Sequence, residues 1–248
     1  MVQRLSGPRV PPRAGGKPRQ LVVLLHGYGA SGEDLIALAP YFQQRLPQAA
    51  FVAPHAPRPV PGMPPGMDGR QWFALDGYDP GRMRRDPRFA AGIYAGMAQG
   101  ADQAAPAIDA LLDEELARYG LQDGDLALVG FSQGTMMALH VGLRRQAAPA
   151  CILGYSGALV DGRGQEDAAA ASGAGWRSRP PVMLIHGDAD EVVPVEAMFE
   201  AGQALAAGGL AVIWHVSRGA PHSIDEDGVL LGSSFLARHL HGRRGEAG

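Results

Sequence analysis

The stretch Asp125-Leu126-Ala127-Leu128-Val129-Gly130-Phe131-Ser132-Gln133-Gly134 decides the fold. It begins as a short apolar run, and residues 135–143 after it carry apolar side chains at helical spacing. A Gly-x-Ser-x-Gly pattern between a strand and a helix is typical of a nucleophile elbow, a tight turn that presents the serine hydroxyl. We therefore predict that Ser132 is a nucleophile. The alternative is a serine between two glycines in an ordinary turn, with no catalytic role.

Strand-like and helix-like segments alternate on both sides of this turn. The predicted strands are short apolar runs bounded by turn signals, at residues 21–25, 50–53, 125–129, 151–155, 182–185 and 211–216. The predicted helices cover about 35–46 with Asp34 as the cap, 88–119 as one long or broken helix, 135–143, 194–207 and 228–240. This order predicts an α/β protein with a mostly parallel central sheet and helices on both faces.

The segments between these elements predict a single domain over residues 1–248. Residues 1–20 read as an extended arm or an edge hairpin, and residues 242–248 as a tail. The proline-rich stretch 54–70 predicts no regular element, and the polar stretch 161–179 predicts a surface excursion. Only about 25 residues separate the strands 151–155 and 182–185, which is too few for a large helical lid. We therefore expect an open cleft.

Composition and charge exclude several classes of function. The 248 residues include 22 Lys and Arg against 25 Asp and Glu, and this net charge of −3 does not favour nucleic acid or acidic lipid. The single cysteine, Cys151, excludes an internal disulfide framework and a cysteine-based zinc site. We expect no secretory signal, because the first residues lack an apolar segment, and the sequence has no apolar run of the roughly 20 residues that a membrane helix needs. We expect a cytoplasmic protein with no stable membrane insertion, and homodimer formation is left open.

The chemistry of Ser132 requires two partners. A serine hydroxyl attacks when a base takes its proton and an acceptor orients that base. In enzymes built around this elbow the acid follows the serine in the chain and the histidine comes last. The loop His186-Gly187-Asp188-Ala189-Asp190 leaves a predicted strand at the carboxyl edge of the sheet, so its two carboxylates compete for the role of acid. We prefer Asp190, because Asp188 lies closer to the strand end and is better placed for turn hydrogen bonds.

Four of the eight histidines follow Asp190, and they differ in where they lie. His215 lies inside a predicted strand, and His239 and His241 belong to the terminal helix and tail. His222 lies in the loop between the last strand and the last helix, which also leaves the sheet at its carboxyl edge. We predict that His222 is the base.

The negative charge that develops on the substrate oxygen requires backbone N–H donors. We predict the N–H of Gln133, at the start of a helix where the dipole favours negative charge, and the N–H of Tyr28 in the loop His26-Gly27-Tyr28-Gly29. Trp72 and Phe73 follow a loop that could edge the cleft, and the sequence leaves pocket wall and ordinary core as alternatives. No histidine pair or oxygen-ligand loop accompanies the acidic residues, so we expect neither a metal nor a cofactor.

Together these motifs resemble the phospholipase/carboxylesterase family that includes the acyl-protein thioesterases, within the α/β-hydrolase superfamily. The matching stretches are Leu25-His26-Gly27-Tyr28-Gly29, Pro54-His55-Ala56-Pro57, Trp72-Phe73, the elbow, His186-Gly187-Asp188-Ala189-Asp190 with Val193-Pro194, and Pro221-His222-Ser223. The resemblance implies Ser132, Asp190 and His222 as a triad, with Tyr28 and Gln133 at the oxyanion hole. Many relatives have leucine where Tyr28 stands.

The expected activity is that of a serine carboxylesterase which hydrolyses small carboxylic esters through an acyl-Ser132 intermediate. A thioesterase acting on acyl-proteins or acyl-coenzyme A, or a lysophospholipase, is the alternative within the enzyme class. A non-catalytic receptor that uses the same cleft for a small molecule is a more distant alternative. Its signature would be a missing triad member, and the sequence supplies all three.

Overall fold

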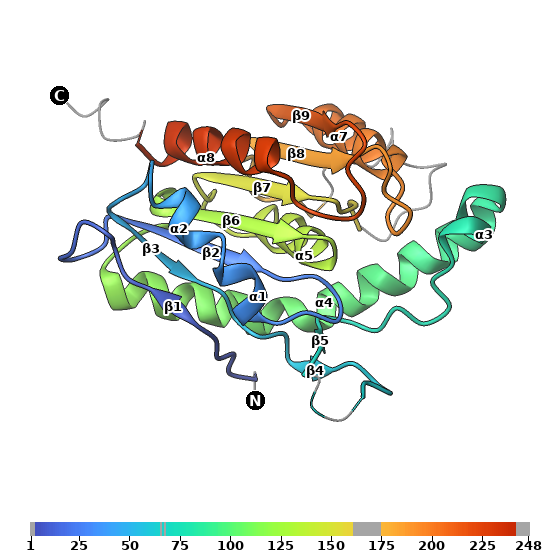
Figure 1. The fold of residues 1–248 in the computed structure, drawn as a ribbon, viewed down its shortest axis with the longest axis horizontal. Helices are drawn as coiled ribbons and strands as arrows, with labels where there is room; N and C mark the ends of the chain where they lie inside the picture. The colour runs from blue at the N-terminus through green and yellow to red at the C-terminus, as the bar shows by residue number, and fades with distance from the viewer. Residues whose placement is uncertain (1–2, 65, 67, 161–174, 242–248) are drawn as a thin grey trace.

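A seven-stranded sheet forms the centre of the computed structural model, which describes residues 3–64, 66, 68–160 and 175–241 (Figure 1). Its strands, in spatial order, are β1 (Arg9–Val10), β3 (Ala49–Val52), β2 (Gln20–Leu25), β6 (Leu126–Phe131), β7 (Cys151–Tyr155), β8 (Val182–Gly187) and β9 (Val212–Ser217). All neighbouring strands are parallel except β1, which pairs antiparallel with β3. The predicted fold class, an α/β protein with a mostly parallel sheet, is confirmed.

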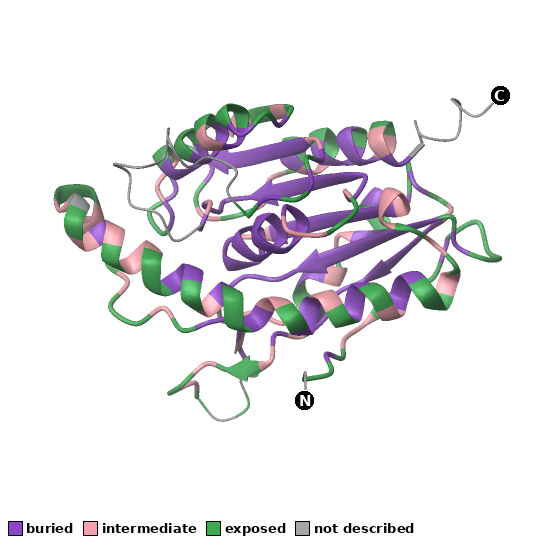
Figure 2. Ribbon diagram, turned by 180° about the vertical axis from the view of Figure 1, so that it is seen from behind, coloured by how far each residue is buried: buried purple, intermediate pink, exposed green. Residues whose placement is uncertain are grey.

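Helices cover both faces of the sheet (Figures 1 and 2). One face packs against α1 (Gly32–Ile36), α2 (Ala39–Phe42) and α8 (Glu226–His241), and the other against α4 (Pro87–Tyr119), α5 (Gln133–Gly142) and α7 (Glu196–Ala207). The inner strands are fully buried, as their unbroken apolar runs predict for a sheet covered on both sides. Two hydrophobic clusters therefore lie on opposite faces of the sheet.

The strand register brings the predicted site loops to one edge of the sheet. Leu25 pairs with Gly130, Phe131 with Tyr155, and Gly187 with Ser217, so the parallel strands end at nearly the same level. The loops that follow β2, β6, β8 and β9 all leave from this carboxyl edge. Ligand sites of open parallel sheets lie at this edge.

The prediction of one helix over about 35–46 is wrong in two respects, because the helix starts earlier and is divided into two. It begins at Gly32 rather than after Asp34, whose carboxylate instead accepts a 2.7 Å hydrogen bond from the N–H of Ser31. It also ends at Ile36, and α2 starts separately at Ala39. The break has a local cause: Pro40 has no N–H to donate to the preceding turn.

Four other segments differ from the prediction or extend it. The stretch 54–70 contains β4 (Arg58–Pro59), which pairs with β5 (Arg70–Gln71) in a small second sheet. The sequence also missed α3 (Pro80–Arg85), which precedes α4. The N-terminal residues contribute the edge strand β1, where Arg9 forms a 2.6 Å ion pair with the buried Glu115 of α4. Residues 161–174 of the predicted excursion and the tail 242–248 lie outside the described residues, whereas Trp176 and Ser178 are buried rather than exposed.

Candidate active site

The turn at Ser132 has the strained backbone of an elbow. Ser132 adopts φ 55° and ψ −118°, a conformation that side-chain-bearing residues rarely take. A β-carbon on Gly130 would lie 2.4 Å from backbone atoms of Gly134, and one on Gly134 would lie 1.8 Å from the carbonyl oxygen of Leu25. Both glycines are therefore required by the close crossing of β6, β2 and the start of α5.

Asp190 is held as a carboxylate by hydrogen bonds from every side. Its Oδ1 accepts from the backbone N–H groups of Val192 at 2.9 Å and Val193 at 2.8 Å, and its Oδ2 lies 2.7 Å from Nδ1 of His222. The side chain has no solvent exposure. Burial opposes its ionisation, but the hydrogen bonds from His186, His222 and the Val193 backbone outweigh burial and hold the pKa of Asp190 well below its ordinary value.

His186, which the sequence analysis quoted but gave no role, supports this carboxylate. Its Nε2 donates a 2.8 Å hydrogen bond to the carbonyl of Val193 and lies 3.3 Å from Oδ2 of Asp190. It therefore fixes both the acid and the backbone that binds the acid. The four-residue spacing between His186 and Asp190 after a strand is the sequence signal that could have indicated this contact.

The structure brings His222 to Asp190 and to the elbow. Nδ1 of His222 donates to Asp190, which leaves Nε2 as an acceptor in the neutral ring. The imidazole lies against the ring of Phe131, the residue before Ser132, with centroids 4.9 Å apart. No hydrogen bond joins the Ser132 hydroxyl to His222 within the described part of the chain, and this contact stays a prediction.

The Asp188 carboxylate bonds to the backbone rather than to a histidine, but its partner lies in another loop rather than in its own turn, where the sequence analysis predicts it. It accepts a 2.5 Å hydrogen bond from the N–H of Gly219, in the loop that carries His222. Asp188 thus ties the acid loop to the histidine loop without contacting the imidazole. This arrangement supports Asp190 over Asp188 as the acid.

Two hydrogen bonds fix the side chain of Gln133, whereas its backbone N–H makes no hydrogen bond within the helix. Its Oε1 accepts from the N–H of Trp72 and its Nε2 donates to the carbonyl of Phe73, both at 2.8 Å. As the first residue of α5, Gln133 has a backbone N–H with no partner in the helix. The two side-chain bonds therefore orient the predicted oxyanion donor.

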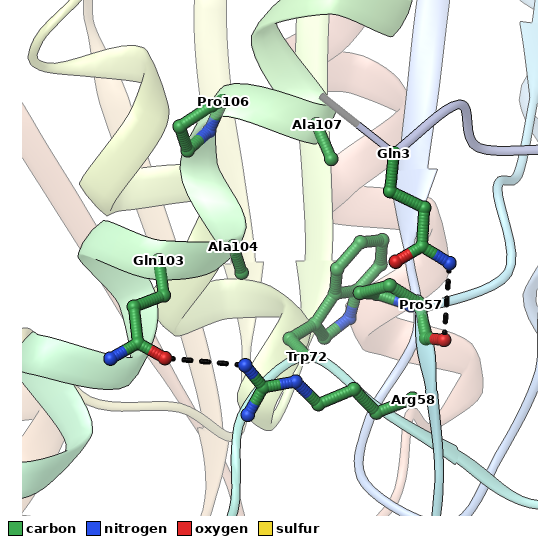
Figure 3. Close-up of a pocket in the computed structure, with 8 residues that line it drawn as sticks. All are labelled: Gln3, Pro57, Arg58, Trp72, Gln103, Ala104, Pro106 and Ala107. Atoms are coloured by element: carbon green, nitrogen blue, oxygen red, sulfur yellow. Dashed lines mark hydrogen bonds between the residues drawn. The ribbon is translucent and has the colours of Figure 1, made fainter. Parts of the chain in front are cut away.

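The sequence left pocket wall and ordinary core as alternatives for Trp72 and Phe73, and the structure favours the core over a substrate-binding wall. Both side chains are 1% exposed and belong to the core cluster. Trp72 lines a cavity of about 470 Å³ beside α4, shown in Figure 3, and none of the predicted triad residues lines that cavity. Instead, the indole N–H of Trp72 donates a 2.9 Å hydrogen bond to the carbonyl of His26. Trp72 therefore connects the two loops that carry the predicted oxyanion donors.

The loop that carries Tyr28 is braced at both ends. His26 donates from Nδ1 to the carbonyl of Gly27 at 2.7 Å and accepts at Nε2 from the N–H of Ala56 at 2.9 Å. Burial lowers the pKa of His26 to about 4, so the ring is neutral at physiological pH. Arg70 of β5 exchanges backbone hydrogen bonds with Gly29 and Ala30, both at 2.9 Å. The sequence analysis missed this bracing strand.

Comparison with known proteins identifies the family. The sequence profile of the phospholipase/carboxylesterase family matches residues 12–240. The chain belongs to this family. It is similar to the crystal structure of esterase PE8, with 39% identity, a TM-score of 0.82 and coverage of 96% of this chain and 100% of that one. It is also similar to acyl-protein thioesterase 1 of Gibberella zeae, with 26% identity over 88% of this chain and 90% of that protein. A third relative, acyl-protein thioesterase 1 of Neurospora crassa, is 29% identical over 69% of this chain and 67% of that protein.

Membership of the phospholipase/carboxylesterase family makes the chain a serine hydrolase of the α/β-hydrolase superfamily that acts on ester bonds. No helix within the described ranges combines the length and the apolar character needed to cross a bilayer. Across those same residues, no cluster of three or more His, Cys, Asp or Glu side chains is placed to bind a metal ion.

Proposed function

We propose that this family member is a carboxylesterase that cleaves small carboxylic esters through an acyl-Ser132 intermediate. The observation that carries the proposal is the 2.7 Å hydrogen bond between Nδ1 of His222 and the buried Asp190, because it leaves Nε2 free to accept a proton beside the elbow. The strained Ser132 turn and the braced donors at Gln133 and Tyr28 support the same reading.

The proposed reaction has two halves. In the first, Nε2 of His222 takes the proton of Ser132 as its oxygen attacks the ester carbonyl, and the backbone N–H groups of Tyr28 and Gln133 stabilise the oxyanion. The imidazolium then gives this proton to the departing alkoxide. In the second half, His222 takes a proton from water, the resulting hydroxide attacks the acyl-serine, and the same proton returns to the Ser132 oxygen. Asp190 stabilises the imidazolium in both halves.

The nucleophile is tested with Ser132→Ala. We expect the hydrolysis of p-nitrophenyl acetate to slow by about 10⁶-fold in kcat, because triad members act as a unit. Wild-type protein should also be labelled by a fluorophosphonate, and the variant should not. If Ser132→Ala retains more than about a tenth of the wild-type activity, the nucleophile assignment fails.

A thioesterase is the second candidate, because two curated relatives of similar length are acyl-protein thioesterases. Matched oxyesters and thioesters of one acyl chain separate the two readings. The proposed carboxylesterase should give the higher kcat/KM on the oxyester. A preference of about tenfold or more for the thioester would select the thioesterase.

A further inference from the structure

Tyr78 lies in residues 74–79, the loop that leads from Phe73 to α3. Figure 1 shows this loop running past the carboxyl ends of the strands to reach α3. The backbone N–H of Tyr78 donates a 3.1 Å hydrogen bond to the carbonyl of Leu75, and the next residue, Asp79, caps α3. The aromatic ring packs against the hydrophobic cluster on the α4 and α7 face of the sheet. Both the backbone and the ring of Tyr78 are therefore held in place.

The Tyr78 hydroxyl reaches a carbonyl in the loop of the predicted acid, 114 residues further along the chain. It donates a 2.7 Å hydrogen bond to the carbonyl of Val192. The same peptide group carries the N–H of Val193, which donates a 2.8 Å hydrogen bond to Oδ1 of Asp190. One peptide group therefore separates the phenol from the carboxylate. Because a carbonyl that accepts a hydrogen bond polarises its peptide, the bond from Tyr78 strengthens the donor that Asp190 receives.

Side chains hold the backbone around this peptide. Val192 and Val193 lie after the end of β8 at Gly187 and before the start of α7. The carbonyl of Val193 accepts a 2.8 Å hydrogen bond from Nε2 of His186, and that of Val192 accepts from Tyr78. The Val193 side chain is buried, whereas that of Val192 is 45% exposed and contributes little packing. The bond from Tyr78 is therefore a contact that fixes the orientation of the Val192–Val193 peptide.

The orientation of this peptide matters because Asp190 divides its two oxygens between different partners. Oδ1 accepts from the N–H groups of Val192 and Val193, and Oδ2 then faces Nδ1 of His222 at 2.7 Å. A tilted peptide would let the carboxylate turn about its Cβ–Cγ bond and would lengthen the bond to His222. Burial is the largest cause that raises the pKa of Tyr78, so the phenol keeps the proton that it donates at neutral pH.

We propose that Tyr78 is a positioning residue for the reaction: through the Val192–Val193 peptide it holds the Asp190 carboxylate in line with the base. This proposal rests on the esterase function proposed above. The role requires no contact between Tyr78 and the ester, so loss of the hydroxyl should slow the chemical steps without weakening ester binding. Both halves of the reaction pass through the His222 imidazolium, so acylation and deacylation should slow together.

The test is Tyr78→Phe, which keeps the ring and removes only the hydroxyl. On p-nitrophenyl acetate we expect kcat to fall by about tenfold, the scale of one lost hydrogen bond, while KM stays within about twofold of the wild type. Tyr155→Phe is the matched control, because it also removes a hydroxyl that donates to a backbone carbonyl, in this case that of Gly228 in α8. It should lower the melting temperature but leave kcat within about twofold of the wild type.

A double-mutant cycle with Asp190→Asn separates positioning of the acid from a general loss of structure. Because Tyr78 acts through the carboxylate, Tyr78→Phe should lower kcat by less than about twofold in the Asp190→Asn background. The proposal is overturned if folded Tyr78→Phe keeps kcat within about twofold of the wild type, or if it lowers kcat by the same factor in both backgrounds. Failure of the esterase function itself would show differently, as wild-type protein that hydrolyses no p-nitrophenyl ester.

Discussion

Replacing Asp190 by asparagine tests the acid directly, because the structure shows what each atom of the new side chain would meet. The amide oxygen can keep the two backbone N–H bonds that Oδ1 now accepts from Val192 and Val193. The amide NH₂ then faces Nδ1 of His222, where a carboxylate oxygen now lies at 2.7 Å. Two donors cannot bond to each other, so the imidazole must move its proton to Nε2. A protonated Nε2 cannot take the proton of Ser132.

The size of this effect follows from the geometry in two ways. A histidine held in the wrong tautomer lowers kcat by about 10⁴-fold in a well-studied serine protease, which corresponds to about 5.4 kcal/mol. Independently, a carboxylate and an imidazolium at 2.7 Å attract each other by about 6 kcal/mol at an effective dielectric constant of about 20. Both figures describe the same lost stabilisation of the imidazolium, so they are not added. We expect kcat to fall by about 10⁴-fold.

The assay is p-nitrophenyl acetate hydrolysis, with circular dichroism to verify the fold of each variant. Asp188→Asn is the matched control two residues away, because its amide oxygen can keep the hydrogen bond from Gly219. It should retain activity within about threefold of the wild type. The reasoning is refuted if folded Asp190→Asn stays within about tenfold of the wild type, or if Asp188→Asn loses as much activity as Asp190→Asn.

Three further predictions concern stability. Burial lowers the pKa of His26 from 6.5 to about 4, so the unfolded chain takes up this proton first as the pH falls. Urea titrations should therefore show about 3 kcal/mol of unfolding free energy lost between pH 6.5 and pH 4 through this group, and His26→Gln should flatten that slope. Gly134→Ala should destabilise the fold by about 3 kcal/mol or more in thermal melts, because its β-carbon would lie 1.8 Å from the Leu25 carbonyl oxygen. The control is Gly96→Ala on the open surface of α4, which should stabilise the fold by about 0.5–1 kcal/mol. Equal effects of the two substitutions would contradict the geometry. Arg145→Leu should lower the unfolding free energy by roughly 2–4 kcal/mol, because it removes the cation shared by three carboxylates. These belong to Asp109 and Asp113 of α4 and to Asp123 of the 3₁₀ turn Asp123–Asp125. A denaturant midpoint equal to that of the wild type would contradict this prediction.

The order of elements and the candidate triad could be read from local patterns. Apolar runs such as residues 21–25 are too short for buried helices and are bounded by turn residues, so they predict buried parallel strands. The glycines around Ser132 predict a close backbone crossing, because only glycine lacks a β-carbon. Chain order, together with position in the loops after two predicted strands, then selected Asp190 and His222 as candidates. The structure brings these two side chains within 2.7 Å of each other, although 32 residues separate them in the sequence.

The hydrogen bonds that hold the site loops in place could not be predicted from local sequence patterns. Trp72 and Phe73 bond to Gln133 across about 60 residues, and Tyr78 bonds to Val192 across 114. These contacts use backbone N–H and carbonyl groups, which nearly every residue carries, so their partners leave no mark in the sequence. Trp72 illustrates the limit: an aromatic residue after a loop fits a cleft wall as well as a core position, and only the packed structure shows it buried and holding the carbonyl of His26.

The sequence by itself therefore predicted the six parallel strands, most of the helices, their order and the candidate triad, because apolar periodicity, glycine and chain order can be read from the chain. The tertiary structure alone decided how those side chains are held: His186 contacts the acid, Arg70 bonds to the oxyanion loop, and the Tyr78 hydroxyl bonds to the carbonyl of Val192. The physical reason is that a hydrogen bond depends on the positions of two groups in space. Those positions are set by the packing of the whole chain rather than by the neighbours of either residue.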